Sequence, residues 1–466
     1  MLFPSISFLN WFLPLTVLLY FAVPGRGKNV VLLFASLFFY FWGEPVYILV
    51  MLLSALSGWV HALLIDRRRR SGAGGEKALL ASCVAVSAGA LLVFKYSDFF
   101  ISNINALTGA HLPLTGLIMP IGISFYTFQI LSYAVDVYRG QARVQKNPLD
   151  FFMYVTLFPQ LIAGPIVRYQ TVQEELARRQ HSLDGAALGA RRFCVGLGKK
   201  VLIANTLAQL GASSGAPTVL LYWLKSVAFT LQIYFDFSGY SDMAIGLGLI
   251  FGFHFPENFN YPYVSKSISE FWRRWHMSLG TWFRDYVYIP LGGNRVSRPK
   301  WFRNVLVVWL LTGFWHGAQW TFLAWGLLFA LLLLLEKGRF GSSLRRAPAA
   351  VQNAYVLFFV NLSFVVFNAG DMPEALTALG GMFGLGAAGV SDAQSMYLLR
   401  SYGPSLLIAA VLATPLVKTL LEKLSVFRAG KRLLFVLEPL FCAAVLVFAA
   451  GGIVDGSFNP FLYFRF

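Results

Sequence analysis

Charged residues are scarce in this chain. Asp, Glu, Lys and Arg make up 13% of its 466 residues, while hydrophobic residues make up 57%. Soluble domains carry charge on about a quarter of their residues, and no polar stretch here is long enough to enclose a separate soluble core. The composition therefore excludes an ordinary soluble protein. It predicts an all-α polytopic membrane protein, with residues 1–466 forming a single integral-membrane domain.

Cysteine is nearly absent, and the histidines do not occur in pairs. The three cysteines, Cys83, Cys194 and Cys442, are an odd number without C-x-x-C spacing, which excludes a disulfide framework. None of the six histidines has another three or four positions away with a carboxylate beside it, so we expect no metal site. A Gly-Lys-Ser/Thr phosphate loop is missing as well. We therefore expect no bound metal or cofactor.

Basic residues outnumber acidic ones, which gives a formal net charge of +17. They lie in short loops between apolar segments, as in Arg67 to Arg70 and in Arg139, Arg143 and Lys146. Such loops are typical of the cytoplasmic side of a membrane protein. We interpret the charge as a topology signal, with the lipid bilayer as the partner and no binding to nucleic acid.

Apolar segments recur along the whole chain. A window of about twenty residues predicts spans at about 8–24, 29–42, 46–65, 78–96, 117–135, 186–210, 217–235, 302–318, 320–336, 352–368, 403–421 and 432–452. We expect Phe151 to Pro165 to re-enter the membrane without crossing it, because about fifteen residues are too few for a span. Ser265 to Tyr288, with a serine cap and Glu270 in the early turns, predicts an amphipathic interfacial helix. Gly338 to Ala349 and Gly380 to Gln394 are predicted loops.

His316 stands within an almost continuously apolar stretch, from Val305 to Leu335. An ionisable side chain inside a bilayer is a functional candidate by default, although a histidine can also act as polar glue between helices. Gly313 and Gly317 would let backbone or substrate approach the ring, and Trp315 offers a flat wall. Because imidazole changes charge near neutral pH, His316 is a candidate general base for acyl transfer, taking a proton from a hydroxyl.

A second set of polar residues lies upstream. His276 follows Arg273 and Arg274 on the predicted interfacial helix. It is either part of a basic membrane-surface face or a second polar group near the same cavity, where the arginines would meet an anionic donor such as a phosphorylated carrier. Asp236 and Asp242 adjoin an apolar segment, and we expect each to pair with an arginine in a structural salt bridge.

Several sequence blocks stand out between about residues 120 and 326. They are Pro120-Ile121-Gly122-Ile123-Ser124-Phe125-Tyr126, Asp136 to Gly140, Leu157-Phe158-Pro159, Ala163-Gly164-Pro165, Tyr234 to Gly248, Pro256 to Tyr263, Ser267 to Arg295 and Thr312 to Ala318. Together they resemble the bacterial membrane-bound O-acyltransferase (MBOAT) family, in its alginate O-acetyltransferase branch.

The resemblance implies a helical bundle around a central funnel, with re-entrant and interfacial helices. It places His316, in its Trp-His-Gly motif, at the constriction as catalytic base, and it makes His276 catalytically supportive. The substrate-binding residues predicted in these blocks are Trp315, Arg273, Arg274, Asp236 and Asn258.

The resemblance also implies a function. An acetyl group would pass from a cytoplasmic thioester donor, with acetyl-CoA as the expected donor, across the bacterial inner membrane for O-acetylation of an exported polysaccharide such as alginate. The expected partner is an extracytoplasmic SGNH-type acetyltransferase. One alternative is the teichoic-acid D-alanyl transferase branch of the same family, which would use a carrier protein. A transporter or lipid-linked sugar flippase is the alternative from another class, disfavoured because no internal repeat is found.

Overall fold

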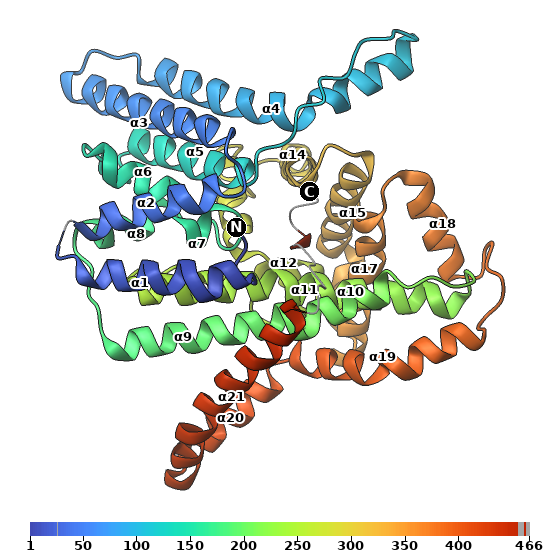
Figure 1. Ribbon diagram of the computed structural model, residues 1–466. Helices are drawn as coiled ribbons and strands as arrows, with labels where there is room; N and C mark the ends of the chain where they lie inside the picture. Colours follow the sequence, from blue (N-terminus) through green and yellow to red (C-terminus); the bar gives the residue numbers. More distant parts are fainter. Residues whose placement is uncertain (26, 455–460, 463–466) are drawn as a thin grey trace. The chain divides into compact units, whose positions relative to one another are not determined.

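Helices are the regular secondary structure of the part of the chain that the structure describes. The computed structural model covers residues 1–25, 27–454, 461 and 462, and no strand occurs among them (Figure 1). Six described helices are long and apolar enough to cross a membrane: α3 (Ile48–Ser71), α4 (Glu76–Thr108), α15 (Trp320–Lys337), α17 (Ala349–Asn368), α19 (Ala393–Leu412) and α21 (Arg428–Val454). The predicted all-α, multi-pass membrane class is therefore confirmed.

The chain forms two compact units. The first comprises Met1–Phe193 with Met243–Pro256, and the second comprises Cys194–Asp242 with Glu257–Phe466. Two continuous helices, α9 (Leu183–Gly198) and α11 (Val219–Ile250), pass from one unit to the other. The single-domain description stays a prediction.

The first unit begins with a π-helical turn, Phe8–Phe12. It continues with α1 (Leu13–Ala22), α2 (Gly27–Phe41), α5 (Ile123–Arg139), α6 (Pro148–Thr156), α7 (Phe158–Leu161) and α8 (Tyr169–Ala177), in addition to α3 and α4. Helices α3, α4 and α5 pack side by side (Figure 1). The segment predicted to be re-entrant forms the short buried helices α6 and α7, each too short to span a bilayer.

The second unit holds the other helices. They are the π turn Lys199–Ala204, α10 (Asn205–Gly211), the 3₁₀ turn Pro262–Val264, α12 (Ile268–Arg274), α13 (Met277–Phe283), the π turn Arg284–Tyr288, α14 (Arg298–His316), α16 (Arg339–Leu344), α18 (Met372–Met382) and α20 (Leu416–Val426), together with α15, α17, α19 and α21. Helices α14 and α15 form an antiparallel hairpin, and α17 packs on α15.

Four predicted elements differ from the structure. Helix α11 continues well beyond residue 235 to Ile250, because its buried carboxylate has a charged partner on a neighbouring helix. The span predicted at 403–421 is interrupted after Leu412, and α20 begins after Pro415. The predicted loop from Gly338 to Ala349 contains α16. The single interfacial helix from Ser265 to Tyr288 is instead two short α-helices and a π turn, broken at His276.

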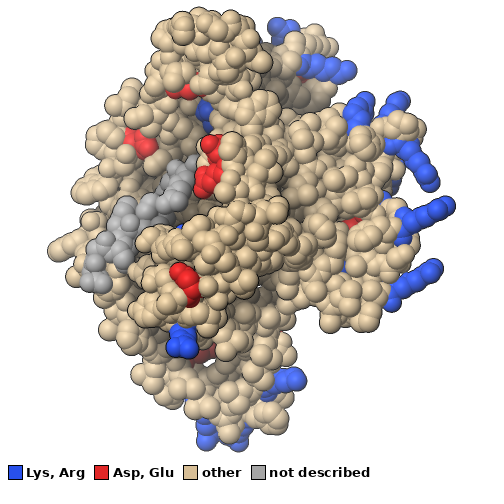
Figure 2. Space-filling model, turned by 90° about the vertical axis from the view of Figure 1, so that its right-hand side faces the viewer, with Lys and Arg blue, Asp and Glu red and all other residues tan. Residues whose placement is uncertain are grey.

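The two ends of the second unit differ in charge. At one end, named here the charge-poor end, the connections 212–218, 317–319, 369–371 and 383–392 contain no Lys or Arg. At the other, the basic end, the connections 289–297, 338–348 and 413–427 carry Arg295, Arg339, Arg345, Arg346, Lys418 and Lys423. In Figure 2, most side chains on the face that is drawn are neither acidic nor basic.

Candidate active site

His316 is the last residue of α14 and lies at the charge-poor end. It is 8% exposed, and its ring meets three aromatic neighbours edge to face. The ring centroids of Trp315, Trp325 and Phe367 lie 5.0, 5.1 and 5.2 Å from that of His316. These side chains come from α14, α15 and α17, so three helices build an apolar cage around one titratable group.

Close packing of α14 against α15 holds this cage together. A Cβ at Gly313 would lie 2.4 Å from the backbone oxygen of Phe322, and one at Gly326 would lie 2.4 Å from that of Trp309. A Cβ at Gly317 would meet the ring of Phe322 at 2.1 Å. Gly313 therefore allows the close approach of backbone that the sequence predicted. Gly317 makes room for the ring of Phe322, a side chain of the protein itself.

His276 lies at the break between α12 and α13. Its backbone has φ 44° and ψ 54°, the left-handed region, which among described non-glycine residues only Tyr261 shares. A side chain in this region costs about 1–2 kcal/mol, and such strain gathers at functional sites. His276 is 1% exposed, and this burial lowers the pKa of its imidazole to about 3. The two short helices that flank it are each too short to span the membrane.

The structure brings His276 and Trp315 together. Their ring centroids are 6.0 Å apart, and Phe237 of α11 lies 4.7 Å from His276 on another side. Trp315 therefore packs against both histidines that the sequence singled out. Residues 40 positions apart along the chain share one aromatic neighbour.

Asn258 supports the segment that carries His276. Its Oδ1 lies 3.1 Å from Nδ1 of His276 and accepts hydrogen bonds from the backbone N–H and the hydroxyl of Ser278. Its Nδ2 donates to the hydroxyl of Ser241 at 3.1 Å, and its backbone oxygen accepts from the N–H of Met277. Asn258 is fully buried. The sequence predicted that Asn258 contacts substrate. Its contacts in the structure instead favour a role in supporting the segment that carries His276.

A buried carboxylate anchors the start of α12. Glu336, in the last turn of α15, accepts hydrogen bonds from the backbone N–H groups of Ile268 and Ser269. Ser267 caps the same helix as its expected serine cap, accepting from the N–H of Glu270. An anionic partner at a helix N-terminus satisfies free N–H groups and complements the helix dipole. Helix α12 therefore starts at the basic end and leads toward the histidines.

The two arginines of α12 differ. Arg274 forms an ion pair with Glu270 at 2.8 Å and also donates to the backbone oxygen of Asn260. Arg273 is exposed, and no described residue forms a hydrogen bond or ion pair with it. Of this predicted donor-binding pair, Arg273 is the one whose guanidinium is available.

Asp236 and Asp242 pair with lysines, where we expected arginines. Nζ of Lys200 lies 2.5 Å from Oδ1 of Asp236, and both side chains are almost completely buried. The other Asp236 oxygen accepts from the backbone N–H of Leu462. Nζ of Lys199 lies 2.6 Å from Asp242 in a more exposed pair. These contacts favour a structural role for Asp236, whose predicted contact with substrate no observation tests.

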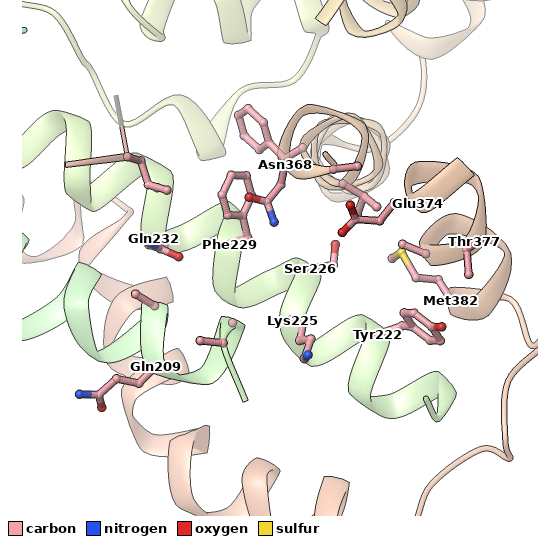
Figure 3. A pocket seen from close by; sticks show the side chains of 18 of the residues that line it. Gln209, Tyr222, Lys225, Ser226, Phe229, Gln232, Asn368, Glu374, Thr377 and Met382 are labelled. Atoms are coloured by element: carbon pink, nitrogen blue, oxygen red, sulfur yellow. The ribbon is translucent and has the colours of Figure 1, made fainter. Parts of the chain in front are cut away.

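A polar pocket of about 760 Å³ opens at the charge-poor end of the second unit. In Figure 3, side chains of α11 face those of α17 and α18 across it. Amides and hydroxyls line it from four helices: Asn205, Gln209, Ser226, Gln232, Asn368 and Thr377. Gln232 is 7% exposed, and its carboxamide has no hydrogen-bond partner among the described residues. Phe364 and Asn368 line the pocket, and Phe367 on the same turn of α17 contacts His316.

Sequence reasoning missed several residues of this region. Trp325 and Phe367 form walls around His316, and Lys200 faces Asp236. Glu336 could have been found, because it is a carboxylate at the end of an apolar span. The aromatic walls could not, since each resembles its many apolar neighbours.

The fold defines a polytopic, all-helical membrane protein in which two buried histidines share one tryptophan neighbour. The membrane-bound O-acyltransferase (MBOAT) family profile matches residues 138–369. The probable alginate O-acetylase AlgI of Azotobacter vinelandii is 40% identical over 88% of this chain and 84% of its own length. The peptidoglycan O-acetyltransferase of Helicobacter pylori is 35% identical over 83% and 80%. The teichoic acid D-alanyltransferase of Bacillus subtilis is 32% identical over 48% and 60%.

The chain belongs to the membrane-bound O-acyltransferase family. It is therefore an O-acyltransferase, and the transporter alternative is set aside.

Proposed function

We propose that this enzyme moves an acetyl group from acetyl-CoA on the cytoplasmic side to a hydroxyl on the outer side of the bacterial inner membrane, for O-acetylation of an exported polysaccharide such as alginate. One observation carries the proposal. A buried histidine at the charge-poor end of a membrane bundle shares Trp315 with a second buried histidine. Relatives named as O-acetylating enzymes match most of the chain.

The charges of the connections support the proposed direction of transfer. Because basic loops stay in the cytoplasm, the basic end of the second unit faces the cytoplasm and the charge-poor end faces outward. Helix α12 leads from the basic end toward His276. His316 lies at the outward end, where an acceptor arrives.

In the proposed reaction His316 is the general base. Its neutral imidazole takes the proton of the acceptor hydroxyl as that oxygen attacks the thioester carbonyl. The new C–O bond forms, the C–S bond breaks, and the proton passes from the imidazolium to the departing thiolate. The aromatic cage excludes water, which keeps the thioester from hydrolysis during this step.

The donor is placed on the basic side. Coenzyme A carries phosphates, and a free guanidinium binds phosphate well. Arg273 on α12 supplies such a group, while Arg274 is engaged by Glu270.

The acceptor is placed in the polar pocket at the outward end. Its amides and hydroxyls both donate and accept hydrogen bonds, as sugar hydroxyls require. Lys225, which lines it, has no ion-pair partner among the described residues and would suit the carboxylate of a uronate. An SGNH-type partner that completes acetylation would dock at the same end.

The D-alanyl alternative is the weaker one. The D-alanyltransferase relative matches about half of this chain, whereas the alginate O-acetylase relative matches nearly nine tenths. Transfer assays with labelled acetyl-CoA and with a D-alanyl carrier protein separate the two, and use of the carrier alone would overturn the acetyl proposal.

The decisive variant is His316→Ala. We expect it to insert normally and to lower acetyl transfer by about 10²–10⁴-fold, the usual range for loss of a general base. Polymer acetylation in cells and transfer by purified enzyme measure this. Transfer at the normal rate by correctly inserted His316→Ala would exclude the role.

A further inference from the structure

Asn258 fixes the protonation pattern of His276. The Oδ1 position of Asn258 faces the backbone N–H of Ser278 at 3.3 Å. A backbone N–H can only donate, so the atom facing it must be the amide oxygen and not the amide nitrogen. The same oxygen faces Nδ1 of His276 at 3.1 Å.

This oxygen leaves one tautomer for the imidazole. An amide oxygen carries only lone pairs, so Nδ1 of His276 must carry a proton to form the hydrogen bond. In a neutral imidazole the second nitrogen, Nε2, then holds a lone pair. Nε2 is buried and has no hydrogen-bond partner among the described residues.

We propose that Asn258 is a positioning residue of the enzyme: it fixes the Nδ1–H tautomer and the orientation of His276, so that Nε2 keeps its lone pair and serves as a proton acceptor in the reaction. The left-handed backbone at His276 supports this inference, since a strained residue persists only where its surroundings hold it. The inference rests on the proposed function only in placing His276 at the reaction.

The surroundings of the ring keep it neutral. Phe237 from α11, Asn258 from the loop before α12 and Trp315 from α14 contact it, and none of them is ionisable. On its own segment, Arg274 is paired with Glu270. His316 is titratable, and it contacts Trp315, which also contacts His276. An acceptor at Nε2 can therefore hold the hydroxyl whose proton His316 removes, or receive that proton in relay.

The test compares two substitutions of Asn258 in the full-length purified enzyme, with labelled acetyl-CoA as probe. Asn258→Leu removes the acceptor, and we expect kcat to fall by about 10²-fold with little change in the KM for the donor. Asn258→Asp keeps an acceptor for Nδ1–H and adds a negative charge. The charge favours the imidazolium, so transfer should persist and the acid limb of its pH profile should move up by about one unit or more.

Ser278→Ala and Ser241→Ala are the matched controls. Each removes a hydrogen bond to the Asn258 side chain and leaves its bond to His276 in place. We expect both to transfer acetyl at near the normal rate. A loss as large as that of Asn258→Leu would mean that Asn258 only holds the loop, and would overturn the proposal.

Two further outcomes would overturn it: a nearly normal kcat in Asn258→Leu, or an unchanged pH profile in Asn258→Asp. The second remains decisive if Asn258→Leu does not fold, which size-exclusion chromatography in detergent shows. Normal transfer by His316→Ala would instead contradict the proposed function.

Discussion

At the scale of single residues, two neighbouring ion pairs differ in burial. Lys200 and Asp236 are 2% and 3% exposed, while Lys199 and Asp242 are 24% and 16% exposed. Removing one partner of a buried pair leaves a charge in a low-dielectric interior, which costs about 3–5 kcal/mol. An exposed pair contributes about 0–1 kcal/mol. The ion pair of Lys200 therefore matters more for stability than that of the adjacent Lys199.

Asp236→Asn should lower the thermal stability of the purified protein strongly, and Asp242→Asn should lower it little. The reason is the buried ammonium of Lys200, which loses the carboxylate 2.5 Å away. Thermal unfolding in detergent, followed by size exclusion, measures both variants. Equal shifts in Tm would contradict this assignment of roles.

At the scale of elements, the close packing of α14 against α15 depends on glycines at their contact. Gly326 lies against the backbone oxygen of Trp309 and Gly313 against that of Phe322. Small residues let helix backbones approach closely in membranes, where packing supplies much of the association energy. This hairpin carries His316, Trp315 and Trp325, so its spacing sets the size of the aromatic cage.

Gly326→Ala should separate the two helices and destabilise the protein by about 1–3 kcal/mol, the usual cost of overpacking. It should also lower acetyl transfer, because the cage around His316 would open. Gly451→Ala on α21 is the control, since a Cβ there has nothing within 4 Å. Its Tm should stay the same or rise slightly, because alanine favours helix over glycine. A Gly326→Ala protein as stable as the control would refute the packing argument.

At the scale of the whole molecule, the proposed orientation rests on the uneven charge of the connections. Ser342 lies exposed at the basic end and Ser391 lies exposed at the charge-poor end. In the proposed orientation the basic end lies in the cytoplasm, and the polar pocket opens outward. The acceptor can then reach the enzyme without crossing the bilayer.

Single-cysteine labelling tests this orientation. In a Cys442→Ala background, where Cys83 and Cys194 are buried, a membrane-impermeant maleimide should label Ser391→Cys in right-side-out vesicles. Ser342→Cys should react only after permeabilisation. The opposite pattern would reverse the proposed direction of acetyl transfer.

Much of the fold was readable from local pattern, because hydropathy over about twenty residues decides whether a segment crosses a membrane. The helices α3, α15, α17 and α21 lie close to their predicted ranges. The break at His276 was not predicted. The segment around it has an amphipathic pattern, and its interruption depends on hydrogen bonds to Asn258, 18 positions away.

The sequence by itself determined that the protein is helical and membrane-embedded, and it singled out His316, because composition and a titratable group in an apolar run are local properties. Only the tertiary structure decided which groups surround this residue. His316 is contacted by Trp325 and Phe367, and His276 is contacted by Asn258. The start of α12 is held by Glu336. All of these partners come from distant parts of the chain. Their roles depend on distances and donor geometry, which arise only when the helices pack.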